Sequence, residues 1–337
     1  MLKTAEAVSI GHPDKTADYI SSYLLDELLK QDPWVHYAVE VMVKDNTVIF
    51  AGEVSGKIEM PDLLTVAQRA YADIGYTKEY SGVWGDHVVN PNKLQIINLI
   101  GAQSSDIGQG VAANGWGDQG VFVGYSCKGE DGLPPELYLA RKLNAALYEM
   151  ALQDNRFGLD TKTQITLDET GQVTTAIVAI PMREVMDLTD FVDTILGQEP
   201  KHLIVNGTGR YTTHSAVADC GVTGRKLACD FYSTACAVGG GSPWGKDATK
   251  ADVTLNHWAH KLAMEHLADN DECYVYLSSC IGQSKLPSAE IKFVKDRVER
   301  WEKIDVQELP SETIQKLRLN TPIFKSLCRA SVGLKNK

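Results

Sequence analysis

A histidine, an acid and a lysine stand together in Gly11-His12-Pro13-Asp14-Lys15, directly before an amphipathic stretch. A helix N-terminus offers free N–H groups and a partial positive charge that suit phosphate, whereas Asp14 would repel phosphate unless a cation lay between them. Mg²⁺ typically takes one or two carboxylates together with phosphate oxygens of a substrate. The motif therefore indicates a magnesium and phosphate site. An alternative stays open, in which Asp14 only stabilises the helix dipole.

A second motif is the glycine-rich loop 239–247, which reads GGGSPWGKD. From Gly240 it matches a phosphate-binding P-loop except at the last position, where Asp247 replaces the Ser or Thr that holds Mg²⁺. The P-loop interpretation is therefore weak, and a surface loop with solvated lysines is the alternative. Its glycines still allow backbone N–H groups to approach an anion. Nearby charge and a candidate metal ligand come from Lys246, Lys250 and Asp252.

Basic residues gather in glycine-bearing turns, although the chain as a whole is acidic. Asp and Glu number 44 against 33 Lys and Arg, and the net charge of -11 disfavours nucleic acid and anionic membranes as partners. A local cluster of Arg and Lys within such a chain predicts a polyanion pocket, and triphosphate fits it best. The cluster comprises Arg210, Arg225, Lys226, Lys246 and Lys250.

Acidic and amide side chains form a fourth group. Glu40 and Glu53 stand in apolar, strand-like segments, and Gln103 and Asp118 stand in polar glycine-bearing segments. A glutamate in an apolar strand is costly if it is buried without a partner. Glu40 and Glu53 are therefore expected either to face solvent or to meet a cation or an ammonium group.

The elements that position these motifs repeat the same order about three times. After Pro13, apolar residues at three- and four-residue spacing predict a helix. Two strands at 35–44 and 48–54 form a hairpin across Asp45-Asn46, and a helix at 61–74 ends at Gly75. The pattern predicts an α+β fold with mostly antiparallel sheets covered by helices. The remaining expected elements are strands at 120–125, 164–167, 173–180, 202–205, 226–232 and 273–279, and helices at 135–152, 189–196, 250–267 and 288–301.

Length and composition set the class of protein. At 337 residues the chain exceeds one compact core, so we expect three pseudo-repeated subdomains at about 1–100, 101–212 and 213–337. No run approaches the roughly 20 apolar residues of a membrane span. The seven cysteines are odd in number and form no Cys-x-x-Cys pair, which favours reduced, mostly buried thiols. The first residues lack the apolar core of a secretory signal, so a cytoplasmic protein is expected.

As an ordered set, these motifs resemble the S-adenosylmethionine synthetase (methionine adenosyltransferase) family. The segments that carry the resemblance run from residue 11 to 252: GHPDK, AVEVMVK, GEV, IGAQSSDIGQGV, GWGDQG, DTKTQIT, TGRY, DCGVTGRK and GGGSPWGKD. The resemblance implies transfer of the 5′-adenosyl group of ATP to the sulfur of L-methionine, followed by cleavage of the triphosphate to phosphate and pyrophosphate. It also implies two Mg²⁺ ions, K⁺, and at least a homodimer with the site between subunits.

The resemblance also implies roles for individual residues. His12 would meet the oxygen that leaves C5′, and the stretch from Ile100 to Val111 would gate the site. His12, Lys162, Arg225 and Lys246 would carry the catalysis. ATP and triphosphate would contact His12, Asp160, Lys162, Arg210, Tyr211, Asp219, Arg225, Lys226, Ser242 and Lys246. Methionine would contact Glu53, Gln103, Asp118, Asp219 and Lys250, while Asp14 and Asp252 would bind Mg²⁺ and Glu40 would bind K⁺.

Some positions depart from the family pattern without removing a charged residue assigned here. His214-Ser215-Ala216-Val217 stands where the family has a Gly-Gly-Pro-like turn, and Pro243-Trp244 replaces smaller residues. Two other hypotheses are a P-loop-like ATPase or kinase, which would hydrolyse ATP to ADP without methionine, and a non-catalytic ATP-binding regulatory subunit. Product formation from ATP and methionine separates all three.

Overall fold

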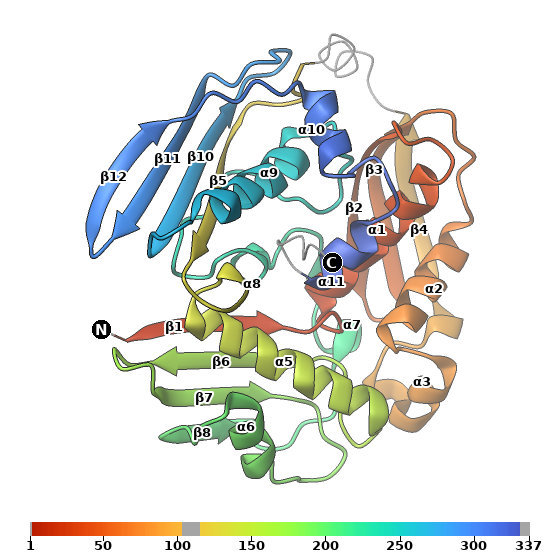
Figure 1. The fold of residues 1–337 in the computed structure, drawn as a ribbon. Coiled ribbons are helices and arrows are strands. Elements are labelled where there is room, and N and C mark those ends of the chain that lie inside the picture. The colour runs from red at the N-terminus through yellow and green to blue at the C-terminus, as the bar shows by residue number, and fades with distance from the viewer. Residues whose placement is uncertain (1, 103–114, 331–337) are drawn as a thin grey trace.

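The computed structural model describes residues 2–102 and 115–330, in which three four-stranded sheets surround three long helices (Figure 1). Helix α1 (Pro13–Leu29) packs on the first sheet, α5 (Pro135–Gln153) on the second and α9 (Ala251–His266) on the third. The expected α+β class with mostly antiparallel sheets and covering helices is confirmed. The first sheet is β4 (Gln95–Ala102), β3 (Thr47–Ser55), β2 (His36–Lys44) and β9 (Gly221–Val222), in that order. The second is β1 (Lys3–Val8), β6 (Lys162–Leu167), β7 (Val173–Ala179) and β8 (His202–Val205); the third is β12 (Val298–Lys303), β11 (Ser288–Lys295), β10 (Glu272–Ser279) and β5 (Gly120–Cys127).

The three repeats exchange their leading strands in a cycle. Each repeat runs from a leading strand through a long helix into an antiparallel hairpin: β2 with β3, β6 with β7, and β10 with β11. The leading strand β1 joins β6 of the second sheet, β5 joins β10 of the third, and β9 joins β2 of the first. Each sheet therefore contains chain from two repeats, and the boundaries 1–100, 101–212 and 213–337 stay a prediction.

Local signals account for the first helices and the first hairpin. Pro13 opens α1, and Asp45 takes a left-handed φ of 53° in the turn between β2 and β3. Helix α2 (Leu63–Ile74) ends at Gly75, whose φ of 107° suits a residue without a Cβ. The other helices are α3 (Lys78–Trp84), α6 (Thr189–Leu196), α7 (Ser215–Ala218), α8 (Leu227–Asp230), α10 (Pro310–Lys316) and α11 (Phe324–Ala330), with single 3₁₀ turns at Gly85–His87, Pro91–Lys93 and Glu130–Gly132.

Two predicted elements are wrong. The helix expected at 288–301 is the hairpin of β11 and β12, because Ile291 and Phe293, two residues apart, are both buried and the strand pairs with β10. The strand expected at 226–232 is the single-turn helix α8, and in the described residues this segment joins none of the three sheets. A short apolar run does not separate strand from helix by periodicity alone.

Two compositional expectations can be compared with the structure. All seven cysteines are free, and five of them are buried, which confirms the expectation of reduced, mostly buried thiols. Among the described residues, none of the helices has the length and apolar character that crossing a bilayer requires.

Candidate active site

The carboxylate of Asp14 is the centre of the first group of charged residues. It is fully buried in the first turn of α1, where Oδ1 accepts a hydrogen bond of 2.9 Å from the N–H of Val222. Its Oδ2 lies 2.5 Å from Nζ of Lys226, and Nε of Arg225 lies 3.5 Å from Oδ1. Burial opposes ionisation, but the bonds from Lys226 and Val222 outweigh it and lower the pKa of Asp14. The alternative in which Asp14 only stabilises the helix dipole is therefore incomplete, because Asp14 also joins α1 to the distant segment at 222–226.

His12 precedes α1 and is neutral at neutral pH. Burial, together with the positive charges of Lys226 and Lys162, lowers its pKa to about 4, against the opposing effect of Asp14 and Asp219. Its Nδ1 accepts a 3.2 Å hydrogen bond from the N–H of Asp14. A neutral ring that accepts at Nδ1 carries its proton on Nε2. His12 can therefore donate a hydrogen bond to an incoming oxygen.

Lys162 lies near His12 and Asp14 because its strand, β6, pairs with β1, which leads into α1. Lys162 begins β6, and its Nζ lies 2.9 Å from Oε2 of Glu6 on β1. The pKa of Glu6 is lowered: burial opposes the shift, and Lys162 is the main group that drives it. The Lys162 side chain is exposed enough to reach a ligand.

The glycine-rich loop is fastened to the first sheet by Asp247, the residue that breaks the P-loop pattern. Asp247 is buried, and its Oδ2 accepts a 2.8 Å hydrogen bond from the N–H of Tyr37. Lys246 pairs with Ala38 as an isolated antiparallel bridge. The structure thus gives Asp247 a role in holding the loop, and a P-loop interpretation loses its remaining support.

Lys246 and Asp252 form an ion pair between this loop and the first turn of α9. A Cβ at Gly241 would lie 2.1 Å from Oδ1 of Asp252, so only glycine allows the backbone to approach this carboxylate. Burial raises the pKa of Glu40, and the positive charge of Lys246 opposes that shift. Glu40 is nevertheless exposed on β2, so it faces solvent, one of the two outcomes expected from the sequence, with Lys246 near enough to affect its pKa.

The turn at 221–225 connects the two charged groups. A Cβ at Gly224 would lie 3.1 Å from Oγ of Ser242, which places this turn against the glycine-rich loop. The hydroxyl of Thr223 accepts a 2.8 Å hydrogen bond from the N–H of Val41 and so joins the turn to β2. The three glycine-bearing segments that the sequence singled out are thus adjacent in space.

Sequence reasoning missed a buried network below these turns. Nζ of Lys15 lies 3.0 Å from Oδ2 of Asp18 and 2.8 Å from Oδ2 of Asp230, and 4.5 Å above the ring of Trp244. Burial raises the pKa of Asp18 to about 7, although Lys15 opposes the shift. Asp18 Oδ1 also accepts a 2.8 Å bond from the N–H of Gly224. The four-residue spacing of the two acids in α1, Asp14 and Asp18, was the available signal for a shared partner.

Of the residues at 160 and 210–219 that were predicted to contact the nucleotide, only some lie close together. Asp160 accepts a 3.1 Å hydrogen bond from the N–H of Ser215, and burial raises its pKa to about 7. Burial raises the pKa of Tyr211, and the negative charge of Asp160 adds to that shift. Arg210 instead donates to the carbonyl of Arg183 at 3.0 Å, and its described contacts do not include the Asp14 group.

The residues predicted for methionine lie on different sheets. Glu53 pairs with Ala38 in β2, so it lies on the same face of the first sheet as Lys246. Asp118 stands just before β5 of the third sheet, where its carbonyl accepts a bond from Ser279. Nζ of Lys250 is buried without a hydrogen-bonding partner in the described residues, as expected of a group that awaits a ligand. Gln103 and most of the stretch Ile100 to Val111 lie outside the described residues.

The predicted metal ligands suit cations that are bound partly by the protein and partly by the substrate. Residues 2–102 and 115–330 contain no group of three or more His, Cys, Asp or Glu side chains that could hold a metal ion by itself. Asp14 and Asp252 instead stand apart, each paired with one lysine ammonium. One carboxylate per ion, with phosphate oxygens completing the shell, is a usual arrangement for Mg²⁺.

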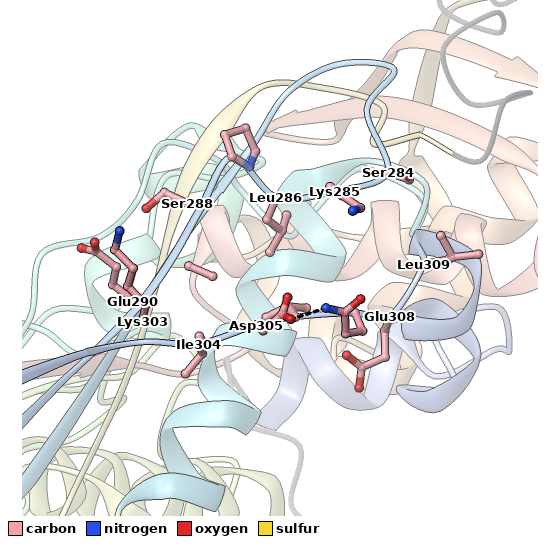
Figure 2. Close-up of a pocket in the computed structure, with 14 residues that line it drawn as sticks. Ser284, Lys285, Leu286, Ser288, Glu290, Lys303, Ile304, Asp305, Glu308 and Leu309 are labelled. Atoms are coloured by element: carbon pink, nitrogen blue, oxygen red, sulfur yellow. Dashed lines mark hydrogen bonds between the residues drawn. The ribbon is translucent and has the colours of Figure 1, made fainter.

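A hollow of about 270 Å³ lies away from these residues, at the end of the third sheet (Figure 2). Residues 284–290 form one side, and 303–309 form the other, where Gln307 bonds to Asp305. None of the residues predicted for chemistry lines it. We therefore attach no catalytic role to this hollow.

Comparison with known proteins identifies the family to which this chain belongs. The sequence model "S-adenosylmethionine synthetase, N-terminal domain" matches residues 1–105, and the corresponding C-terminal domain matches residues 213–334. An S-adenosylmethionine synthase of Paramagnetospirillum magneticum is 35% identical over 84% of this chain and 78% of its own length. One from Pelagibacter ubique is 30% identical over 96% of this chain and 90% of its own. A solved structure described as an unusual S-adenosylmethionine synthetase from Campylobacter jejuni superposes with a TM-score of 0.86, at 26% identity, covering 98% of this chain and 94% of that one. The chain belongs to the S-adenosylmethionine synthetase family.

Proposed function

We propose that this chain transfers the 5′-adenosyl group of ATP to the sulfur of L-methionine, and then cleaves the triphosphate to phosphate and pyrophosphate. One observation carries the proposal. Lys226, directly after the turn at 221–225, pairs with Asp14, and Gly224 of that turn lies against Ser242 in the loop whose Lys246 pairs with Asp252. Neutral His12 accepts a hydrogen bond from the N–H of Asp14. Two acids and two lysines on glycine-bearing turns suit a polyphosphate together with divalent cations.

The mechanism follows from the charges on the reacting groups. The sulfur of methionine is a neutral nucleophile, so the reaction needs alignment and stabilisation of the departing triphosphate more than a general base. Neutral His12 would donate from Nε2 toward the oxygen that leaves C5′. Lys162, Arg225 and Lys246 would stabilise negative charge on the triphosphate.

The same two carboxylates are the proposed metal ligands. In our proposal Asp14 and Asp252 hold two Mg²⁺ ions, and Glu40 holds K⁺. When bound, Mg²⁺ would neutralise charge on the phosphate oxygens. The chain's own part is to present both carboxylates: Lys226 lowers the pKa of Asp14, and Lys246 forms an ion pair with Asp252.

A second copy of the chain would complete the site. The face of the first sheet opposite α1 exposes Met42, Ile97 and Leu99, and the last of these is 63% exposed. Glu53 lies on that face, whereas Asp118 lies just before β5 of the third sheet. We propose that two copies pair through this face, so that Glu53 of one and Asp118 of the other meet one methionine.

Free thiols at all seven cysteines are compatible with the cytoplasm as the compartment.

The test is product formation by the purified protein with ATP, methionine, Mg²⁺ and K⁺. We expect S-adenosylmethionine, phosphate and pyrophosphate, and loss of product when Mg²⁺ is omitted. Lys246→Ala should lower turnover by about a hundredfold, since loss of one transition-state contact has this size. Lys285→Ala, at an exposed lysine in the loop between β10 and β11, is the control and should leave turnover unchanged. ATP binding without product would favour a regulatory subunit, and methionine-independent release of ADP would favour an ATPase.

A further inference from the structure

His214 belongs to the segment that departs from the family pattern, and the structure buries it in an aromatic cage. Its ring centroid lies 4.7 Å from that of Trp84, 6.0 Å from that of Tyr80 and 6.3 Å from that of Tyr76. Burial lowers its pKa to about 4, so the ring is neutral. A neutral histidine in such a cage can hold one fixed tautomer.

The hydrogen bonds of His214 define that tautomer. Nδ1 lies 2.7 Å from the carbonyl oxygen of Thr212, so Nδ1 carries the proton and donates it. Nε2 must then accept, and it lies 2.8 Å from the hydroxyl of Tyr80. That hydroxyl in turn accepts a 3.1 Å bond from the N–H of Leu159. A directional chain therefore runs from Leu159 through Tyr80 and His214 to Thr212.

This chain of bonds flanks Asp160 on both sides. Leu159 directly precedes Asp160, and Ser215, which donates its N–H to Oδ2 of Asp160 at 3.1 Å, directly follows His214. A Cβ at Gly158 would lie 3.1 Å from Nε2 of His214, so the 158–160 turn is in close contact with the ring. The imidazole of His214 and the bond from Ser215 to Asp160 thus both join these two segments, which carry residues proposed to bind the nucleotide.

We propose that His214 and Tyr80 are positioning residues that fix Asp160 for the nucleotide, in place of the glycine-rich turn of the family. Neither side chain touches the reacting atoms. They act by holding the turn 158–160 against the turn 212–215, and their loss lets Asp160 move. The expected effect on catalysis rests on the proposed function. The expected effect on the backbone around Asp160 does not.

Tyr80→Phe is the sharpest test, because it removes only the hydroxyl between Leu159 and His214. We expect the dissociation constant for ATP and the KM for ATP to rise about fivefold, with kcat and the KM for methionine little changed. Amide exchange of a peptide covering residues 157–161 should accelerate. His214→Phe, which keeps a ring in the cage without its hydrogen bonds, should reproduce both effects.

Tyr71→Phe is the matched control. Tyr71 is a buried neighbour of Tyr76 whose hydroxyl has no hydrogen-bonding partner in the described part of the chain. Its substitution should leave ATP binding and exchange at 157–161 unchanged. The inference is overturned if Tyr80→Phe behaves like Tyr71→Phe in both measurements. A wild-type protein that makes no S-adenosylmethionine would overturn the proposed function, while the exchange measurement would still decide the role of Tyr80.

Discussion

Nζ of Lys226 lies 2.5 Å from Oδ2 of Asp14, although 212 residues separate them along the chain. Asp14 has almost no contact with solvent, so the ammonium is the main charge that keeps it ionised. Burial lowers the pKa of His12, and the same ammonium adds to that shift. One lysine thus influences the protonation of two groups of the candidate site.

Replacing this lysine should change both groups. In Lys226→Met we expect the pKa of His12 to rise, because a positive charge near the ring is lost, and the protein to lose about 3 kcal/mol of stability through the unpaired carboxylate. NMR titration and urea unfolding measure the two effects. Adding Asp14→Asn to Lys226→Met should restore much of the stability without restoring activity. A double variant no more stable than Lys226→Met would contradict this account.

Asp247 should matter for the glycine-rich loop through the backbone of β2. Asp247→Ala leaves the buried N–H of Tyr37 without its partner, which is expected to cost about 1 to 3 kcal/mol. The loop then holds Lys246 less firmly, so turnover should fall as well. Thermal unfolding and product formation are the measurements. Asp45→Asn, in an exposed turn that tolerates asparagine, is the control and should change neither.

The last helix, α11, should depend on Asp26 of α1. The buried carboxylate of Asp26 accepts hydrogen bonds from the N–H of Phe324 at 2.9 Å and from that of Lys325 at 3.0 Å. Asp26→Ala should therefore loosen α11 and cost about 1 kcal/mol. Cys328, buried in α11, should then react with a thiol reagent faster than in the wild type. Unchanged labelling of Cys328 would show that α11 docks without this contact.

Acid should destabilise the protein through its buried histidines. Burial lowers the pKa of His257 to about 4, below the usual value of 6.5. The unfolded chain therefore binds a proton that the folded one does not between about pH 6.5 and 4, so this histidine makes stability fall as pH falls through that window. Asp18 and Asp160, with raised pKa values, act in the opposite direction, so variants must be compared with the wild type at each pH.

His257→Leu removes this proton uptake. The difference in unfolding free energy between variant and wild type should shift in favour of the variant on acidification, by at most about 1.4 kcal/mol per pH unit. Urea unfolding at a series of pH values measures it. His202→Gln, at an exposed position in β8, should leave the wild-type pH dependence in place. A parallel curve for His257→Leu would mean that folding does not lower the pKa of His257.

The sequence alone determined the long helices, the first hairpin and the segments that carry charge. Helical spacing of apolar residues, Pro13 at the start of α1 and Gly75 at the end of α2 are local signals, and they need no partner to be recognised. The charged residues on glycine-bearing turns identified the chemistry for the same reason. Each motif lies within a few consecutive residues.

Only the tertiary structure decided how those parts meet. Whether residues 288–303 form a helix or a hairpin depended on the hydrogen bonds that β10 offers to β11. The exchange of β1, β5 and β9 between sheets and the pairing of Lys226 with Asp14 depend on contacts between distant segments. Such contacts form because buried backbone groups and charges must find partners, and the order of residues along the chain does not say which partner that is.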